Sequence, residues 1–474
     1  MAARSAETSK LNLLFITADD MNADSPGWMG SDMGATPVLD GFAATCHRFV
    51  NDHVTVPICQ PSREAFMTGR VPHHSGGLGF NPITPGTPTL VTVLQAAGYY
   101  TAAVNKISHM QPPSAFPWDD KFDGSGKNPA FMRTQFEKTL KSAAASGKPF
   151  FINVNIQYPH RPFPGSNATD AEEGDSTAPK AAGGMPKRKG ENAMGGKLDN
   201  LTHIYKPEEI KVPDFLEDIP PVKVEVAQYY TAVAHVDVCL YGVLEALKAS
   251  GHENDTIIVF MSDHGMSFPF AKATAYYNGT HSPVILKYPG MPAPAVHEEL
   301  VSSVDIMPTL LDLLAVKYPE GLDGRSWVAL LNGEKQDGRD YVVTHVNTVS
   351  SGASYPQRCI RTKDWALLFQ SWPDGTAKFR VEAMSGITFK ALEEAGKSDE
   401  RIAARVKQLR VAEPLMFFNE ISDPTERNNS IGDAHYAAEI QRLAGLLLAH
   451  MEKTSDPQTA NFKKAYEDWK AKAK

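Results

Sequence analysis

Short runs of consecutive apolar residues recur along the first half of the chain. The runs are Leu13–Thr17, Tyr99–Val104, Phe150–Asn155 and Thr256–Phe260. Unbroken apolar runs of this length are typical of strands that are covered on both faces. Segments with helical spacing separate these strands, over residues 89–97, 135–145 and 227–248. The alternation predicts an α/β fold, with a large parallel-rich sheet sandwiched by helices.

Polar residues that can do chemistry follow each predicted strand. In a parallel sheet the carboxyl ends of the strands meet at one edge, where ligands bind. We therefore expect one set of acids, histidines and a lysine to gather at that edge, namely Asp19, Asp20, Lys106, His109, His160, Asp263 and His264.

The pattern changes after about residue 340. Strand-like pieces, "YVVTHV", "RCIRTKDWALLFQ", "KFRVEAM" and "LMFFNEI", alternate there, and a final helix reads "AAEIQRLAGLLLAHMEK". We predict an α/β domain over residues 1–340 and a smaller α+β domain, with an antiparallel sheet and helix, over 341–474. Residues 164–200, rich in Gly, Ala, Lys and Glu, predict a long surface loop, either a plain insertion or a lid that faces a substrate.

The amino-acid composition limits the kinds of binding partner that we expect for this protein. Among 474 residues, 47 are Lys or Arg and 55 are Asp or Glu, so the net charge is 47 − 55 = −8. This balance argues against nucleic acid or an anionic membrane surface as the main partner. We expect no apolar run long enough to span a bilayer, and no apolar signal core in "MAARSAETSKLNLLFITADD". The four cysteines lie far apart without CxxC spacing, which makes a zinc knuckle or a disulfide framework improbable.

One cysteine stands at a special place. In "ICQPSREAFMTGR", Cys59 precedes Pro61-Ser62-Arg63, which suits a helix start with Pro in the first turn and Ser near the cap. Helix starts attract anions. A nucleophile beside an anionic substrate and a small buried apolar cysteine are both consistent with this position.

The acids at the strand ends offer hard oxygen ligands. Asp19, Asp20 and Asp263 together suit Ca²⁺ or Mg²⁺, although each alone is also typical of a helix cap or a turn.

A longer motif then identifies the chemistry. Cys-x-Pro-Ser-Arg-x-x-x-Met-Thr-Gly-Arg, which begins at Cys59, resembles the signature of the formylglycine-dependent type I sulfatases of the alkaline phosphatase superfamily. Asp19-Asp20 resembles the metal pair of that family, and Ser262-Asp263-His264-Gly265 its second metal motif. "LMFFNEISDPTERNNSIGD", residues 415–433, is similar to its C-terminal segment.

The resemblance implies that a formylglycine-generating enzyme oxidises Cys59 to Cα-formylglycine. It implies a Ca²⁺ site made by Asp19, Asp20, Asp263, His264 and the modified Cys59. Many sulfatases have Asn where this chain has His264, and an imidazole leaves Mg²⁺ and Mn²⁺ as alternatives.

The resemblance also implies a mechanism. One hydroxyl of the formylglycine diol attacks sulfur, and the second then loses its proton as sulfate leaves and the aldehyde returns. Arg63 braces the site, Lys106 and Lys272 hold sulfate oxygens, and His160 binds sulfate and is the candidate general acid. His109 resembles the histidine of a Lys-x-His element, with one extra residue in the spacing.

Two segments look like the heparan N-sulfatase (sulfamidase) branch. They are "SDHGMSFPFAKATAYYNGT", residues 262–280, and "SYPQRCIRTKDWALL", residues 354–368. The second makes Arg358 a candidate contact for a sugar carboxylate or sulfate, with a surface arginine in a strand pair as the alternative.

We therefore expect a sulfatase that acts on a sulfated carbohydrate, with either an N-sulfate or a sulfate ester as the target. Two alternatives stay open: a phosphonate monoester or phosphodiester hydrolase of the same superfamily, and a sulfated-glycan binder in which Cys59 is not oxidised. The family also suggests a secreted or periplasmic location.

Overall fold

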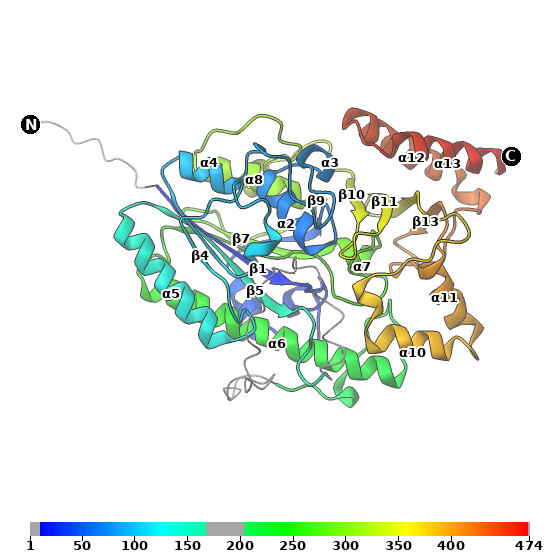
Figure 1. The fold of residues 1–474 in the computed structure, drawn as a ribbon, viewed down its shortest axis with the longest axis horizontal. Helices are drawn as coiled ribbons and strands as arrows, with labels where there is room; N and C mark the ends of the chain where they lie inside the picture. The colour runs from blue at the N-terminus through cyan, green and yellow to red at the C-terminus, as the bar shows by residue number, and fades with distance from the viewer. Residues whose placement is uncertain (1–9, 167–202, 473–474) are drawn as a thin grey trace, which may run out of the picture.

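A computed structural model describes residues 10–166 and 203–472 (Figure 1). The predicted loop at 164–200 therefore lies almost wholly outside the described residues.

A mixed, parallel-rich sheet forms the centre of the molecule. Strand β1 (Asn12–Asp19) pairs in parallel with β5 (Phe150–Pro159) on one side and with β6 (Thr256–Ser262) on the other. The strand order is β4-β3-β5-β1-β6-β7-β2-β8, with β9 also beside β2. The remaining strands of this sheet are β2 (His47–His53), β3 (Tyr100–Val104), β4 (Asp120–Phe122), β7 (His281–Lys287), β8 (Val296–His297) and β9 (Val301–Ser302).

Helices cover both faces of this sheet, which explains the unbroken apolar runs. In β1, Leu14 and Ile16 point into the core under α5 (Pro129–Ser146) and α6 (Pro220–Ala249). Leu13 and Phe15 point into the opposite core. That core lies under α2 (Cys59–Thr68), α4 (Leu90–Ala96) and α8 (Ile306–Leu313), as Figure 1 shows. The predicted fold class is confirmed.

Helix α6 corrects one expectation. By length and composition alone its 30 residues could cross a membrane. Most of the helix is buried against β5, α5 and α1 (Pro37–Ala43), so its apolar surface is covered within the domain.

A separate antiparallel sheet lies in the C-terminal region. Its order is β10 (Val342–Thr348), β11 (Ser354–Arg361), β12 (Trp365–Gln370) and β13 (Leu415–Asn419). Helices α12 (Ala437–Lys453) and α13 (Thr459–Lys472) pack on it through a shared apolar core. The other α-helices are α3 (Pro72–Ser75), α7 (Tyr277–Thr280), α9 (Val328–Leu331), α10 (Ile387–Ala395) and α11 (Glu400–Arg410).

The strand expected at "KFRVEAM" is wrong. Between β12 and β13 the chain leaves the sheet, and its last residues form a short 3₁₀ helix, η6 (Glu382–Met384), directly before α10. The alternation resembles a strand because Phe379, Val381 and Ala383 are buried, but in the core that α6 shares with one face of the antiparallel sheet, and not as a strand paired within a sheet.

Candidate active site

The carboxyl ends of β1 and β6 place the acids together. Ala18 is in register with Ser262, so Asp19 and Asp20 follow one strand directly beside Asp263 and His264 on the other. The backbone N–H of Asp20 donates to the Asp263 carboxylate at 3.1 Å. Asp20 adopts a left-handed conformation with φ 69°, a backbone strain of the kind found at functional sites.

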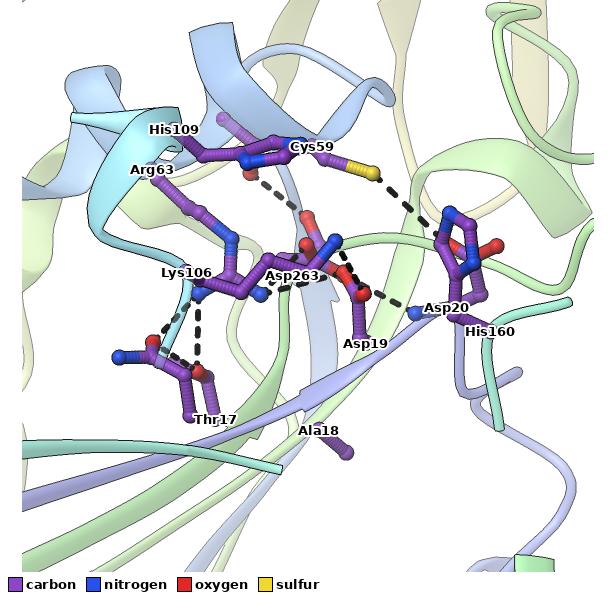
Figure 2. A network of polar contacts seen from close by, with 12 residues as sticks. Thr17, Ala18, Asp19, Asp20, Cys59, Arg63, Lys106, His109, His160 and Asp263 are labelled. Carbon is purple, nitrogen blue, oxygen red and sulfur yellow. Dashed lines mark hydrogen bonds and ion pairs between the residues drawn. The ribbon is translucent and has the colours of Figure 1, made fainter. Parts of the chain in front are cut away.

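Cys59 is the first residue of α2 and points at this cluster. Its Sγ lies 3.2 Å from His264 Nε2. It also lies 3.7 Å from an Asp20 carboxylate oxygen, as Figure 2 shows. The cysteine is 2% exposed. Ser62 is not a helix cap as expected, because its hydroxyl instead donates to the Asp263 carbonyl at 2.6 Å and so fixes the helix to the end of β6.

The buried donors fit a divalent cation. Single ligand atoms of Asp20, Cys59 and His264 lie within 4.8 Å of one another, as do those of Asp19, Cys59 and Asp263. Carboxylate oxygens dominate this set, which suits a hard cation, and the one imidazole widens the choice to transition metals.

Three buried cations offset the three carboxylates. Arg63 Nη2 lies 3.2 Å from Asp19 and 2.9 Å from Asp263. Lys106 Nζ lies 2.6 Å from Asp19, and Lys272 Nζ lies 2.8 Å from Asp20. These ion pairs offset the charges of Asp19, Asp20 and Asp263, so an added divalent ion contributes positive charge that favours an anionic substrate.

The environment disfavours a thiolate at position 59. Burial raises the pKa of the Cys59 thiol well above its ordinary value, and Asp19, Asp20 and Asp263 raise it further, against the opposing effect of Lys272. Burial and the three carboxylates thus favour the thiol of Cys59 over its thiolate.

The carboxyl groups of Asp19 and Asp20 differ in their pKa values. Burial raises the pKa of Asp20 to about 6, although Lys272 and His264 oppose the shift. For Asp19, burial acts in the same direction, but Lys106, His160 and Arg63 outweigh it and hold the pKa well below the usual range. Asp19 is thus the more firmly ionised of the two donors.

The predicted histidines both lie near these charges. His160 follows β5, with one ring nitrogen within 4.8 Å of an Asp20 carboxylate oxygen and its Nδ1 2.5 Å from the Arg161 carbonyl. His109 ends the short 3₁₀ helix η2 (Ile107–His109) after Lys106. Burial and then Lys106 hold the pKa of His109 well below its ordinary value. Figure 2 shows both rings beside the network.

Arg358 is the exception and corrects the expectation of a substrate contact. Its side chain is fully buried, with Nε 2.6 Å from Asp456, so it is not a surface arginine either. The remaining donors go to Asp456, Asn347 and the carbonyls of Val346 and Gln357. No donor is left for a ligand, because the donors bind within β11, to β10 and to Asp456, which follows α12.

Sequence reasoning missed Glu382, from η6. One of its carboxylate oxygens lies 3.1 Å from Lys272 Nζ and the other 3.8 Å from His160 Nε2. No motif surrounds this residue, and the strand-like pattern at "KFRVEAM" points away from the site. Only the packing of the C-terminal region against α6 brings it there.

A parallel-rich sheet that gathers carboxylates and a buried cysteine at its carboxyl edge places the chain among proteins of the alkaline phosphatase-like fold. The sulfatase family model matches residues 11–316, and a model described as the C-terminal part of N-sulphoglucosamine sulphohydrolase matches residues 263–375. The chain therefore belongs to the sulfatase family, whose members are hydrolases of sulfuric esters that use a metal ion and formylglycine.

Curated relatives agree with this assignment. Human N-sulphoglucosamine sulphohydrolase is 29% identical over 382 residues, which cover 75% of this chain and 72% of that protein. An ulvan-active sulfatase of Formosa agariphila is 26% identical over 76% of this chain and 66% of its own length.

Solved structures share the fold. A structure described as a complex with its substrate D-glucosamine-2-N,6-O-disulfate has a TM-score of 0.67 at 19% identity, covering 95% of this chain and 99% of its own. A phosphonate monoester hydrolase from Silicibacter pomeroyi has a TM-score of 0.64 at 20% identity, covering 94% and 96%. At such identities the likeness concerns the fold alone.

Proposed function

We propose that this sulfatase removes sulfate from a sulfated carbohydrate, as an N-sulfate or a sulfate ester. The observation that carries the proposal is the placement of Cys59 Sγ 3.2 Å from His264 and 3.7 Å from Asp20, inside the donor cluster. The similarity to human N-sulphoglucosamine sulphohydrolase supports a sugar as the substrate.

The proposal includes two groups that complete the site. Asp19, Asp20, Asp263 and His264 hold the metal, which we propose to be Ca²⁺ with Mg²⁺ or Mn²⁺ as alternatives. When bound, the ion supplies Lewis-acid polarisation. A formylglycine-generating enzyme converts Cys59 to formylglycine, whose hydrate supplies the nucleophile.

The chain's own residues bind and orient the substrate. The ammonium groups of Lys106 and Lys272 lie within 3 Å of the metal-binding carboxylates and neutralise sulfate oxygens at that point. A ring nitrogen of His160 lies within 4.8 Å of an Asp20 carboxylate oxygen, so His160 is placed to move a proton at the leaving atom. Arg63 keeps the carboxylates in position. His109 stays in the proposal as a weaker candidate for sulfate binding.

Sulfate release from a panel of defined sugars tests the proposal. The protein is co-expressed with a formylglycine-generating enzyme, and mass spectrometry of the tryptic peptide checks position 59. We expect release from N-sulfoglucosamine or from an O-sulfated sugar, and none from a Cys59→Ala control. No release from any sugar, with formylglycine present, would contradict the carbohydrate assignment.

A phosphonate monoester hydrolase is the second candidate, because His264 stands where many sulfatases have Asn. The ratio of activities on 4-nitrophenyl sulfate and on a 4-nitrophenyl phosphonate ester separates the two. Higher activity on the phosphonate ester than on the sulfate would identify the protein as a phosphonate monoester hydrolase.

A further inference from the structure

Glu382 reaches the site from outside the α/β sheet and is held there firmly. The backbone N–H groups of Ile387 and Thr388, at the start of α10, donate to the Glu225 carboxylate of α6 at 3.0 and 2.7 Å. Arg161, next to His160, pairs with the same carboxylate at 2.5 Å. The segment that carries Glu382 is thus tied to the strand end that carries His160.

One oxygen of the Glu382 carboxylate has a partner and the other has none. Oε2 lies 3.1 Å from Lys272 Nζ. Oε1 lies 3.8 Å from His160 Nε2 and forms no hydrogen bond, although the side chain is only 9% exposed. A buried acceptor without a donor is costly, so this oxygen calls for a partner that the described residues do not supply.

His160 does not supply that donor. Its Nδ1 lies 2.5 Å from the Arg161 carbonyl, which can only accept, so Nδ1 bears the proton. A neutral ring then has no proton on Nε2, and at 3.8 Å from Glu382 Oε1 neither protonation state of the ring gives that oxygen a hydrogen bond. Two acceptors, His160 Nε2 and Glu382 Oε1, therefore face each other beside Asp20.

A group placed between them must donate hydrogen bonds. The N–H of a sulfamate and the hydroxyl groups of a sugar are such donors, and an aryl sulfate has none. We propose that Glu382 is a specificity-determining residue that accepts a hydrogen bond from an N–H or O–H group of the sugar beside the reacting sulfate. The inference rests on the proposed function.

The negative charge of Glu382 has opposite effects on substrates with and without a hydrogen-bond donor. A carboxylate 3.1 Å from Lys272 opposes the binding of sulfate by that lysine, so its removal should not harm a substrate recognised by sulfate alone. Its presence is an advantage only for a substrate that brings a donor. A water molecule between the two acceptors would instead serve sugar and aryl substrates equally.

The test compares substrates in formylglycine-containing Glu382→Gln and Glu382→Ala enzymes. Wild type and variants are assayed for kcat/KM on N-sulfoglucosamine, an O-sulfated glucosamine and 4-nitrophenyl sulfate. We expect the ratio of sugar to aryl kcat/KM to fall at least about tenfold, because hydrogen bonds to charged groups are typically worth that much. Glu394→Gln, an exposed carboxylate on α10 whose side chain is 74% exposed, is the matched control.

The outcomes separate the possibilities. A loss confined to N-sulfoglucosamine assigns the donor to the sulfamate N–H, and a loss on both sugars assigns it to a hydroxyl; either supports the inference. Equal loss on sugars and aryl sulfate would show that Glu382 acts through Lys272 or a water, and an unchanged ratio would show that it has no role; either overturns the inference. A wild-type enzyme inactive on every sulfated substrate means that the proposed function fails, and the inference fails with it.

Discussion

Arg63 and Asp263 form a buried ion pair in which Arg63 Nη2 lies 2.9 Å from a carboxylate oxygen of Asp263. The same guanidinium contacts Asp19 at 3.2 Å, Thr17 at 3.0 Å and Asn155 at 2.5 Å. One side chain of α2 therefore joins the carboxyl end of β1, the middle of β5 and the residue that follows β6. The Arg63 guanidinium thus fixes the position of the helix that carries Cys59 relative to the strands that carry the acids.

Replacing Arg63 should damage both stability and activity. Arg63→Ala leaves Asp19 and Asp263 without their shared counter-charge, and breaking a buried pair typically costs about 3–5 kcal/mol. Arg63→Lys keeps the charge but cannot donate to several acceptors in the planar geometry of a guanidinium, so we expect an intermediate loss of stability and activity. Urea unfolding and sulfate release measure the two effects. Arg133→Ala, which removes an exposed pair with Glu137, should change neither, and a stable, active Arg63→Ala protein would contradict the role given to this residue.

The metal preference should depend on His264. After chelation we expect no sulfate release, and we expect Mn²⁺ to restore activity at least as well as Ca²⁺, since an imidazole suits transition metals better than a hard-oxygen site does. His264→Asn should shift the preference toward Ca²⁺. Reactivation by a series of added metals measures the order. The same order in both proteins would mean that His264 is not a metal ligand.

Arg358 should matter for folding rather than for substrate. Arg358→Ala leaves Asp456 buried without its partner, so a loss of about 3–5 kcal/mol in the free energy of unfolding is expected. Asp456→Asn should cost a similar amount. The KM for the sugar, measured on the folded fraction, should stay unchanged in either variant. A large rise in KM at unchanged stability would restore the expectation of a substrate contact.

Acid should destabilise the contact between the C-terminal helix α12 and the α/β part. Burial and then His73 lower the pKa of His450 from its ordinary value to about 4. Between these two pKa values the unfolded chain binds a proton that the folded chain does not. The contribution of neutral His450 to the free energy of unfolding is therefore fully present well above pH 6.5, and it is lost as the pH falls toward 4. This group alone should cost about 2 kcal/mol at pH 5.

Urea unfolding at pH 7.5 and pH 5 measures this loss. His450→Gln removes the titrating group and should make the two midpoints more alike. An equal loss of stability in wild type and variant would mean that His450 does not titrate between the folded and unfolded states. His345, whose pKa burial and then Arg358 also hold well below the ordinary value, adds to the wild-type loss in the same direction.

Local pattern was sufficient for several elements. Apolar runs identified β1, β3, β5 and β6 because their side chains alternate between two buried cores, so no polar face interrupts them. Helix α4 begins where Thr89 predicts, since its hydroxyl accepts from the Thr92 N–H at 3.2 Å. Ser62 was misinterpreted because a hydroxyl near a helix start can also bond to a distant carbonyl, here that of Asp263.

By itself, the sequence determined the α/β class, the family and the candidate residues that follow the strands, because strand burial and the Cys59 motif are local properties of the chain. Only the tertiary structure decided which side chains share a charge or a donor. Arg358 forms a buried ion pair with Asp456. Glu382, from a segment whose sequence resembles a strand, lies beside His160. Both outcomes depend on contacts between residues about a hundred or more positions apart, and such contacts follow from how the cores pack rather than from any short pattern.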